Sequence, residues 1–276
     1  MYTLNCKGKL IIITEPLVMG IINSTPDSFY QLHATPVINN AVSLAEKMVS
    51  EGADILDIGG QSTRPGSVRI SAGEEIARVV PLIEILHDRF PGTIISIDTY
   101  NSEVALAAVT AGASIVNDIS GGTLDANMID TVAKMQVPYV CMHTRGTPET
   151  MQHDTEYENI TRELLDYFIK KTQECQRAGI NDIIIDPGFG FAKTITQNLQ
   201  LLKRLDIFKM LDRPILSAIS RKATIYKTLG ITVNEALNGT TVLNTIALMN
   251  GVSLLRVHDV KAAKEAVKLF TAYCTA

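Results

Sequence analysis

The chain has 276 residues, 46% of them hydrophobic, and a formal net charge of −4 at pH 7. Such a charge creates no global basic field, which excludes nucleic acid and acidic membrane surfaces as expected partners. The length exceeds the usual domain size of about 100–200 residues, but α/β barrels of about 250 residues form one domain. We therefore expect a single domain over residues 1–276.

The cysteines and the amino-terminal segment indicate where the protein works. The four cysteines have neither CxxC spacing nor the density of a disulfide framework, which favours reduced thiols. Lys7 and Lys9 precede an apolar stretch of only residues 10–13, so we expect no signal peptide. No stretch approaches the roughly 18 apolar residues that span a bilayer. A cytoplasmic protein is expected.

In chain order, the first expected element is a β-hairpin over residues 2–14, with its turn at Lys7-Gly8-Lys9. The turn separates two short stretches that have strand character. In a barrel, such a ribbon would plug or rim the amino-terminal end.

After the hairpin, short apolar runs typical of buried parallel strands alternate with amphipathic segments. The runs begin near Leu17, Ala53, Thr93, Ser114, Pro138, Asp182, Pro214 and Ser253. The expected helices span residues 37–50, 74–89, 102–111, 126–135, 156–178, 198–205, 234–249 and 261–273. The expected amino-terminal caps are Asn101 and Asp125, and the expected helix stops are Gly52, Gly112 and Gly179. Eight such units predict an α/β fold, the closed (β/α)₈ TIM barrel.

These runs lead into polar residues, and in a parallel barrel all strand carboxyl ends meet at one face. The loops at residues 23–29 and 59–66 contribute hydroxyls, an amide, a carboxylate and a guanidinium. This set suits phosphate oxygens together with a hard cation on the amide oxygen. The alternative is ordinary turn chemistry, because the same residue types dominate loops.

Asp98, Asn117 and Asp186 form a second set, each in or just after an apolar run. Burial of such a polar group without a partner costs about 1–3 kcal/mol. A planar ligand rich in NH donors would satisfy all three in the barrel mouth. Taken singly, each carboxylate is better explained by a lysine partner or a helix cap, and only the joint pattern favours the ligand.

Basic residues follow the last two apolar runs, in the segments Ser220-Arg221-Lys222 and Arg256-Val257-His258. The last two strands of such barrels are the usual phosphate end, so an anion is expected there. Arg256 can stack on a planar ligand, whereas Lys222 can serve only as a point donor. The alternatives are salt bridges to nearby aspartates and a structural role for His258.

Three further observations bear on the chemistry. Phe189 and Phe191 lie in a Gly-rich loop where an aromatic ligand could pack, although core packing is the better reading for Phe189. His143 follows the fifth run and is expected to be structural. The chain has no HExxH, Walker A or spaced Cys/His motif, which disfavours a tight zinc site or an NTPase.

Eight motifs, in order from Met19 to Val260, together resemble the dihydropteroate synthase family of pterin-binding enzymes. They are MGIINSTPDSF, DILDIGGQSTRPGS, SIDTY, NDISGG, MHTRGTPETMQ, DPGFGFAKT, SRK and RVHDV. The resemblance implies condensation of 6-hydroxymethyl-7,8-dihydropterin pyrophosphate with p-aminobenzoate, which gives 7,8-dihydropteroate and pyrophosphate. It also implies a homodimer formed through the later helices.

The resemblance assigns the site residues by position. The pterin would be held by Asp98, Asn117, Met142, Asp186, Lys222 and Arg256. Pyrophosphate would be held by Asn23 through Mg²⁺, and by Thr63, Arg64, Arg256 and His258. The p-aminobenzoate site, where sulfonamides would compete, would use Phe29, Thr63, Pro65, Phe191 and Lys193.

Charge suggests the course of the reaction. Mg²⁺ and three basic side chains would offset the charge that develops on pyrophosphate, so carbon–oxygen cleavage can precede amine attack. Asp27 would stabilise the resulting pterin cation, which makes the reaction SN1-like. The expected catalytic residues are Asp27, Arg64, Lys222, Arg256 and His258.

The chain departs from the family pattern at several loop positions. The family commonly has Val, Glu, Met, Gly and Ser where this chain has Ser24, Gln61, Thr144, Ala192 and Ala223. Residues 30–33 also lack the usual Ser-Asp-Gly-Gly turn. These departures bear on the first loop and on the fit of p-aminobenzoate, and Ala223 offers no hydroxyl to it.

Two rival functions share the pterin pocket. A methyltetrahydrofolate methyltransferase would use the same acceptors but has no need of Arg64, Lys222 and His258 to receive pyrophosphate. A non-catalytic pterin-binding paralogue would carry degraded loops, yet both loops here retain their polar residues. These are Asn23, Asp27, Thr63 and Arg64.

Overall fold

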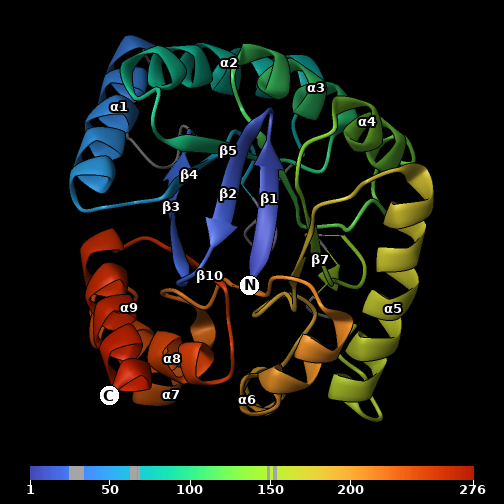
Figure 1. The fold of residues 1–276 in the computed structure, drawn as a ribbon, viewed down its shortest axis with the longest axis vertical. Helices are drawn as coiled ribbons and strands as arrows, with labels where there is room; N and C mark the ends of the chain where they lie inside the picture. Colours follow the sequence, from blue (N-terminus) through green and yellow to red (C-terminus); the bar gives the residue numbers. More distant parts are fainter. Residues whose placement is uncertain (25–33, 63–66, 68, 148–149, 152–153) are drawn as a thin grey trace.

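The computed structural model describes residues 1–24, 34–62, 67, 69–147, 150–151 and 154–276. Its main sheet has eight parallel strands in the order β8-β7-β6-β5-β4-β3-β10-β9. A parallel bridge between Ile185 and Ile215 joins the first strand of that order to the segment leading into the last. The strands thus form a nearly closed barrel inside a ring of helices (Figure 1), as predicted.

The elements follow the predicted alternation. The barrel strands are β3 Leu17–Asn23, β4 Ile55–Gly59, β5 Ile94–Asp98, β6 Ile115–Asp118, β7 Tyr139–Met142, β8 Ile183–Asp186, β9 Leu216–Ser217 and β10 Leu254–Val257. The helices are α1 Ala34–Ser50, α2 Ala72–Arg89, α3 Ser102–Ala111, α4 Met128–Met135, α5 Ile160–Ala178, α6 Ile195–Lys203, α7 Ala223–Leu229, α8 Leu237–Met249 and α9 Val260–Thr275, with a 3₁₀ helix at Leu205–Leu211. Every residue of β4 and β5 is buried, because such strands are covered on both faces.

The amino-terminal hairpin closes one end of the barrel. Strands β1 Tyr2–Cys6 and β2 Lys9–Ile13 pair antiparallel around Lys7 and Gly8, whose φ angles of 51° and 88° suit a two-residue hairpin turn. Leu4, Cys6 and Ile13 pack against the interior residues at the amino-terminal part of the barrel. The predicted plug is therefore confirmed, and it leaves the opposite end for ligands.

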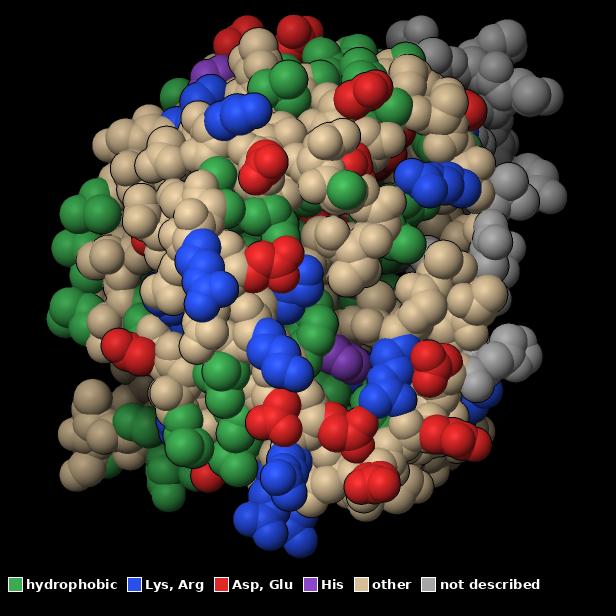
Figure 2. All heavy atoms as spheres, turned by 90° about the vertical axis from the view of Figure 1, so that its right-hand side faces the viewer, with side chains coloured by type: hydrophobic (Ala, Val, Ile, Leu, Met, Phe, Trp, Pro, Cys, Tyr) green, Lys and Arg blue, Asp and Glu red, His purple; other side chains and the backbone are tan. Residues whose placement is uncertain are grey.

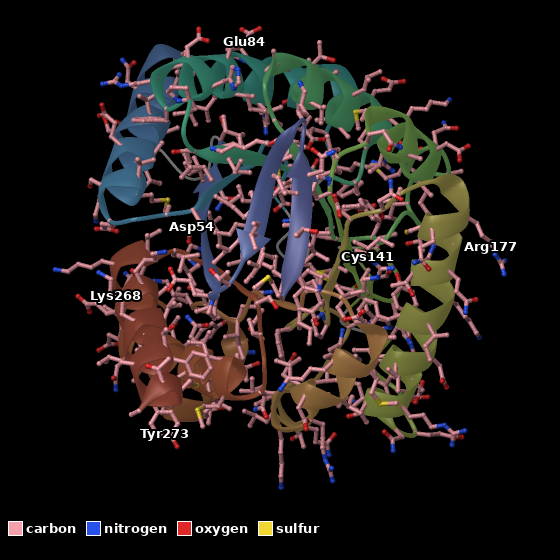
Figure 3. All side chains as sticks on the ribbon, viewed as in Figure 1. Asp54, Glu84, Cys141, Arg177, Lys268 and Tyr273 are labelled. Carbon is pink, nitrogen blue, oxygen red and sulfur yellow. The ribbon has the colours of Figure 1, made fainter. Side chains whose placement is uncertain are left out.

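A larger apolar core lies between the strands and the helices. Phe168 on α5 and Phe208 in the 3₁₀ helix meet edge-on within it, with ring centroids 5.8 Å apart. Figure 3 shows Cys141 inside this shell, whereas Arg177 and Lys268 point away from it. All four cysteines are unpaired, as predicted. No helix in the described part of the chain is long and apolar enough to cross a membrane.

The predicted helix caps can be compared with the observed helix ends. Asn101 caps α3 as predicted, and Gly112 and Gly179 end α3 and α5. Asp125 does not cap α4: its carboxylate accepts from the backbone N–H groups of Ser102 and Asn127, so it stabilises the start of α3 instead. The 3₁₀ helix and α7 were not predicted, because seven residues are too few to display helical periodicity.

Ala192, where the family commonly has glycine, carries backbone strain. It is fully buried and has a φ of 50°, a left-handed conformation that costs a non-glycine residue about 1–2 kcal/mol. Ala192→Gly should therefore raise the free energy of unfolding by about 0.5–1 kcal/mol after the entropy cost of glycine. The same change at Ala107, inside α3, should lower it by about 1 kcal/mol. Urea denaturation measures both, and a loss of stability in both variants would refute the strain.

Candidate active site at the carboxyl ends of the strands

The predicted polar residues meet inside the barrel mouth because side chains alternate along each strand. The interior apolar layer includes Ile55, Ile94, Ile115, Val140, Ile184 and Leu254. Residues two positions farther along a strand face the same way. In the layer above the apolar one, these residues are Asp57, Ser96, Asn117, Met142, Asp186 and Arg256. Asn23 and Asp98 follow at the ends of β3 and β5.

Five predicted site residues lie outside the described residues. They are Asp27, Phe29, Thr63, Arg64 and Pro65. Two described residues that flank these loops form side-chain hydrogen bonds with nearby backbone. Gln61 accepts from the Ile70 N–H at 2.8 Å, and the Ser24 hydroxyl donates to the Arg78 carbonyl at 3.3 Å. The side chains of Gln61 and Ser24, two positions at which the chain departs from the family pattern, thus form hydrogen bonds with the backbone.

An ion-pair network crosses the mouth at Arg256. Its Nε donates to Asp57 Oδ2 at 2.6 Å, and its Nη2 donates to Asp98 Oδ2 at 2.5 Å. Asn117 Nδ2 donates to the same Asp57 oxygen at 3.0 Å. Sequence reasoning missed Asp57 because it lies in the middle of an apolar run. Its signal is the two-residue period from Ile55, which places it on the interior face.

The acidic side of the network has unused hydrogen-bonding capacity. Among the described residues, Asp57 Oδ1 and Asp98 Oδ1 are buried and have no partner. Burial raises the pKa of Asp98 to about 7, while Arg256 opposes that rise. Burial lowers the pKa of Arg256, yet Asp57 and Asp98 raise it overall. The mouth therefore contains a guanidinium held between carboxylates, with acceptor oxygens left for a ligand that donates.

Asp186 and Lys222 form the second charged group of the mouth. Asp186 Oδ1 accepts from the Gly188 N–H at 2.8 Å, and burial raises its pKa while Lys222 opposes this. Lys222 Nζ donates to the Phe189 carbonyl and lies 4.6 Å from the ring centroid of Phe191. Burial lowers the pKa of Lys222 to about 8, with Asp186 acting in the opposite direction. Phe189 itself is in the core, as predicted.

Lys193 is more enclosed than expected of a ligand contact. Its ammonium donates to the carbonyls of His143, Gly188 and Phe191 at 2.9–3.3 Å, and it lies 3.1 Å from His143 Nδ1. Burial lowers the pKa of Lys193 to about 7. Burial also lowers the pKa of His143 to about 2, so a neutral ring can accept from the lysine. The pair holds the loop between β8 and α6, which agrees with a structural role for His143.

His258 lies at the rim of the mouth, one residue beyond β10. Its Nδ1 is 3.1 Å from the Ser220 hydroxyl. Partial burial, and then the charge of Arg256, lower its pKa to about 4. The ring is therefore neutral at pH 7, and an anion bound beside it would raise its pKa. Ala223 begins α7 directly after Lys222 and offers no hydroxyl.

Comparison with known proteins agrees with this geometry. Residues 19–258 match the family described as pterin binding enzyme. Dihydropteroate synthase from Streptococcus pyogenes serotype M3 (strain ATCC BAA-595 / MGAS315) is 40% identical over 268 residues, which cover 96% of this chain and 98% of that protein. The chain belongs to the dihydropteroate synthase family. The fold and function implied by its motifs are thus confirmed.

Solved dihydropteroate synthases share the whole barrel. The Xanthomonas albilineans enzyme with 4-aminobenzoic acid has a TM-score of 0.93 at 36% identity and covers 99% of this chain and 98% of its own. The Yersinia pestis enzyme in a sulfonamide drug complex has a TM-score of 0.94 at 36% identity, with complete coverage of both chains. This dihydropteroate synthase family member therefore has the same architecture as relatives that bind these two classes of aromatic ligand.

Proposed function

We propose that the barrel mouth is the active site in which this member of the dihydropteroate synthase family joins 6-hydroxymethyl-7,8-dihydropterin pyrophosphate to p-aminobenzoate. The observation that carries the proposal is that the buried Asp98 Oδ1, beside the guanidinium of Arg256, has no hydrogen-bond partner in the part of the chain that the structure describes. A buried acceptor of this kind is satisfied by a ring NH donor, and a guanidinium can lie on a flat ring. The pterin ring system has both properties.

The pterin would be bound by complementary groups around its edge. Asp98, Asn117 and Asp186 would accept hydrogen bonds from its NH groups, and Lys222 would donate to its acceptor side. Met142, buried in a cluster with Tyr100 and Ile119, would form the apolar wall. Arg256 would lie against the ring face.

The pyrophosphate would lie beside Asn23, Arg256 and His258, with Thr63 and Arg64 from the second loop. Gly59 leaves room there: a Cβ at this position would lie 3.6 Å from both Asn23 Oδ1 and Asp98 Cβ. Mg²⁺ prefers oxygen ligands and binds few protein groups alongside phosphate oxygens, so a single Asn23 oxygen at this cradle fits it. When bound, Mg²⁺ would neutralise part of the charge on the leaving pyrophosphate.

The p-aminobenzoate would bind on the outer side of the pterin, between Phe191 and the two loops that carry Phe29, Thr63 and Pro65. The Phe191 ring faces the Lys222 ammonium, which supports a position for this ring next to the proposed pterin site as well. Lys193 would contribute through the loop that it holds, in addition to any direct contact. We expect sulfonamides to compete at this site, since they match the aryl amine in shape.

The reaction would follow from the charges in the mouth. The carbon–oxygen bond breaks with its electron pair on the pyrophosphate, whose charge Arg64, Arg256 and His258 offset. Asp27 stabilises the pterin cation, which gives the step SN1 character. The amine of p-aminobenzoate then forms the carbon–nitrogen bond and releases a proton.

A coupled pyrophosphate-release assay tests the proposal. Release should require both substrates and Mg²⁺, and it should stop when EDTA removes the metal. Pterin binding without release would favour a non-catalytic pterin-binding module. Methyl transfer from methyltetrahydrofolate to a corrinoid, without pyrophosphate release, would favour the methyltransferase reading.

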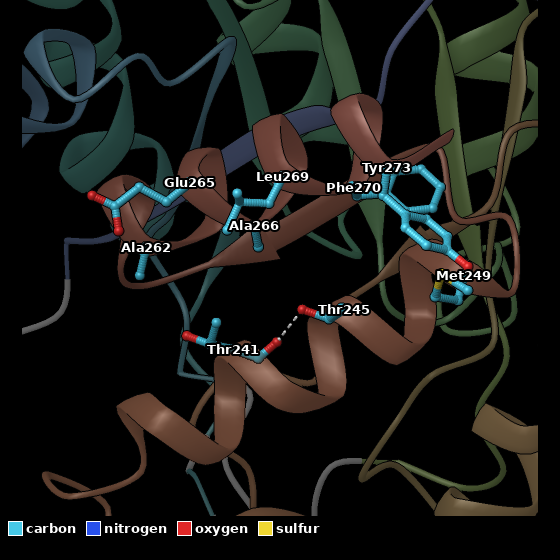
Figure 4. Close-up of a pocket in the computed structure, with 9 residues that line it drawn as sticks. All are labelled: Thr241, Thr245, Met249, Ala262, Glu265, Ala266, Leu269, Phe270 and Tyr273. Atoms are coloured by element: carbon cyan, nitrogen blue, oxygen red, sulfur yellow. Dashed lines mark hydrogen bonds between the residues drawn. The ribbon is translucent and has the colours of Figure 1, made fainter. Parts of the chain in front are cut away.

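The proposal also includes a homodimer formed through α8 and α9. These helices flank a groove of about 440 Å³ that contains exposed apolar side chains, among them Met249, Leu269 and Tyr273 (Figure 4). The opposite side of the barrel is different: over α5, acidic and basic side chains are interspersed (Figure 2), including the pairs Arg162–Asp166 and Lys171–Glu174. The exposed apolar surface along α8 and α9 therefore suits burial against a second copy. The unpaired cysteines suit the reducing cytoplasm, where we place the enzyme.

Leu269→Glu tests this interface. The wild type should sediment at twice the monomer mass of 30.1 kDa, and the variant should sediment as a monomer because a buried, unpaired carboxylate opposes association. Leu106→Glu is the matched control, since Leu106 is exposed on α3, away from the groove. A dimeric Leu269→Glu variant, or a monomeric wild type, would contradict the proposed interface.

A further inference from the structure

Asp57 is a fully buried carboxylate to which the proposed reaction assigns no contact with substrate. It lies on β4 above the interior apolar layer, with Ile21 and Ser96 as its neighbours on the adjacent strands. A single oxygen, Oδ2, accepts from both Arg256 Nε and Asn117 Nδ2. One side chain therefore joins two residues that the proposed function places on the pterin.

The bond from Asn117 decides which end of its amide a ligand meets. A carboxamide has a donor end and an acceptor end on the same carbon. Because a carboxylate can only accept at Oδ2, it must be the NH₂ end of Asn117 that faces Asp57. With its NH₂ end bonded to Asp57, Asn117 presents its Oδ1 at the other end of the amide, where it can accept from a ring edge that donates.

The bond from Arg256 fixes the plane of the guanidinium. Asp57 holds the Nε edge and Asp98 holds Nη2, on strands that lie side by side. Two bonds from different nitrogen atoms of a planar group leave it little rotational freedom. Among the described residues, none accepts a hydrogen bond from Nη1, so this end is available to an anion.

We propose that Asp57 is a positioning and specificity-determining residue, which acts through Asn117 and Arg256 to make the pterin site an acceptor of ring NH groups. The inference rests on the proposed function, because it concerns the same pocket. It predicts that loss of the Asp57 carboxylate weakens binding of the pterin pyrophosphate and leaves the KM for p-aminobenzoate nearly unchanged.

The test is Asp57→Asn, measured by calorimetric binding of the pterin pyrophosphate and by steady-state kinetics. The new amide can donate to Asn117, which lets that side chain turn its own NH₂ end toward the ligand. We expect the dissociation constant and KM for the pterin pyrophosphate to rise about 10–100-fold, since hydrogen bonds to charged groups contribute about 1.5–3 kcal/mol. The KM for p-aminobenzoate should stay within about twofold of the wild-type value.

Asp118→Asn is the matched control. Asp118 is equally buried on β6, two strands away from β4, but it accepts from Ser120, Gly122 and the Tyr139 hydroxyl, away from the barrel interior. Its loss should lower thermal stability without changing pterin affinity. Asp57→Glu, which keeps the carboxylate but displaces it, should lose about 3–10-fold in affinity and serves if Asp57→Asn does not fold.

A double-mutant cycle separates positioning from general damage. In an Asn117→Ala background, Asp57→Asn should weaken pterin binding by a factor at least about threefold smaller than in the wild type, because part of its effect passes through Asn117. Independent, multiplying effects would overturn the inference, as would wild-type affinity in Asp57→Asn. Failure of the wild type to bind the pterin pyrophosphate would overturn the proposed function and this inference with it.

Discussion

Arg256→Met should lower the free energy of unfolding by about 3–5 kcal/mol, because it leaves two buried carboxylates without their cation. Asp57 and Asp98 are both buried, and each has an oxygen within 2.6 Å of the guanidinium. The same change removes the group proposed to lie on the pterin face and to receive the pyrophosphate charge. We therefore expect kcat/KM to fall by about a thousandfold or more.

The loss of stability should depend on pH in a defined direction. The pKa of Asp98 is about 7 in the folded protein, above its usual value of 3.8, and Arg256 holds it down. Without Arg256 this pKa rises further, so the folded state binds a proton that the unfolded state releases. That contribution is present at low pH and is lost as pH rises. Denaturation at pH 5 and pH 8 should therefore show a larger defect at pH 8.

Two variants control the Arg256 experiment. Arg256→Lys keeps the charge but cannot donate to both carboxylates in the guanidinium plane, so stability should recover more than activity. Lys264→Met breaks a part-exposed pair with Asp54 in the segment before β4, away from the mouth. It should cost at most about 1 kcal/mol and leave activity unchanged. An Arg256→Met protein with wild-type turnover would refute the proposed site.

Asp186→Asn should reduce kcat/KM for the pterin pyrophosphate by about a hundredfold, since it replaces a charged acceptor with a neutral amide. Asp186 also acts on Lys222, because its charge opposes the fall that burial causes in the lysine pKa. Without that charge, Lys222 loses its proton at lower pH. The site then lacks an acceptor on one side and a cation on the other.

The pH profile distinguishes this mechanism from simple damage. In the wild type, kcat/KM should decline above about pH 8, where Lys222 deprotonates. In Asp186→Asn, the decline should begin at lower pH because the pKa of Lys222 falls. Thermal unfolding checks that the variant is folded. An unchanged profile with reduced activity would mean that Asp186 does not set the charge of Lys222.

Several features of this protein could be predicted from local patterns. Apolar runs separated by amphipathic segments specify parallel strands and covering helices, and eight such units close a barrel. Asp98, Asn117, Asp186 and Arg256 were predicted to meet because strand carboxyl ends share one face. The motifs that contain these residues also identify the family, so the reaction could be predicted without coordinates.

Only the tertiary structure decided which side chains pair. Arg256 and Asp57 are 199 residues apart, and no local pattern links them. Asp125 was predicted to cap its own helix, yet it accepts from Ser102 at the start of α3. The resemblance implied a place for Lys193 in the p-aminobenzoate site, but no local pattern indicated that its ammonium donates to carbonyls of its own and a neighbouring loop. Side-chain periodicity determines the face on which a residue lies, whereas its partner depends on how strands distant in the chain are brought together.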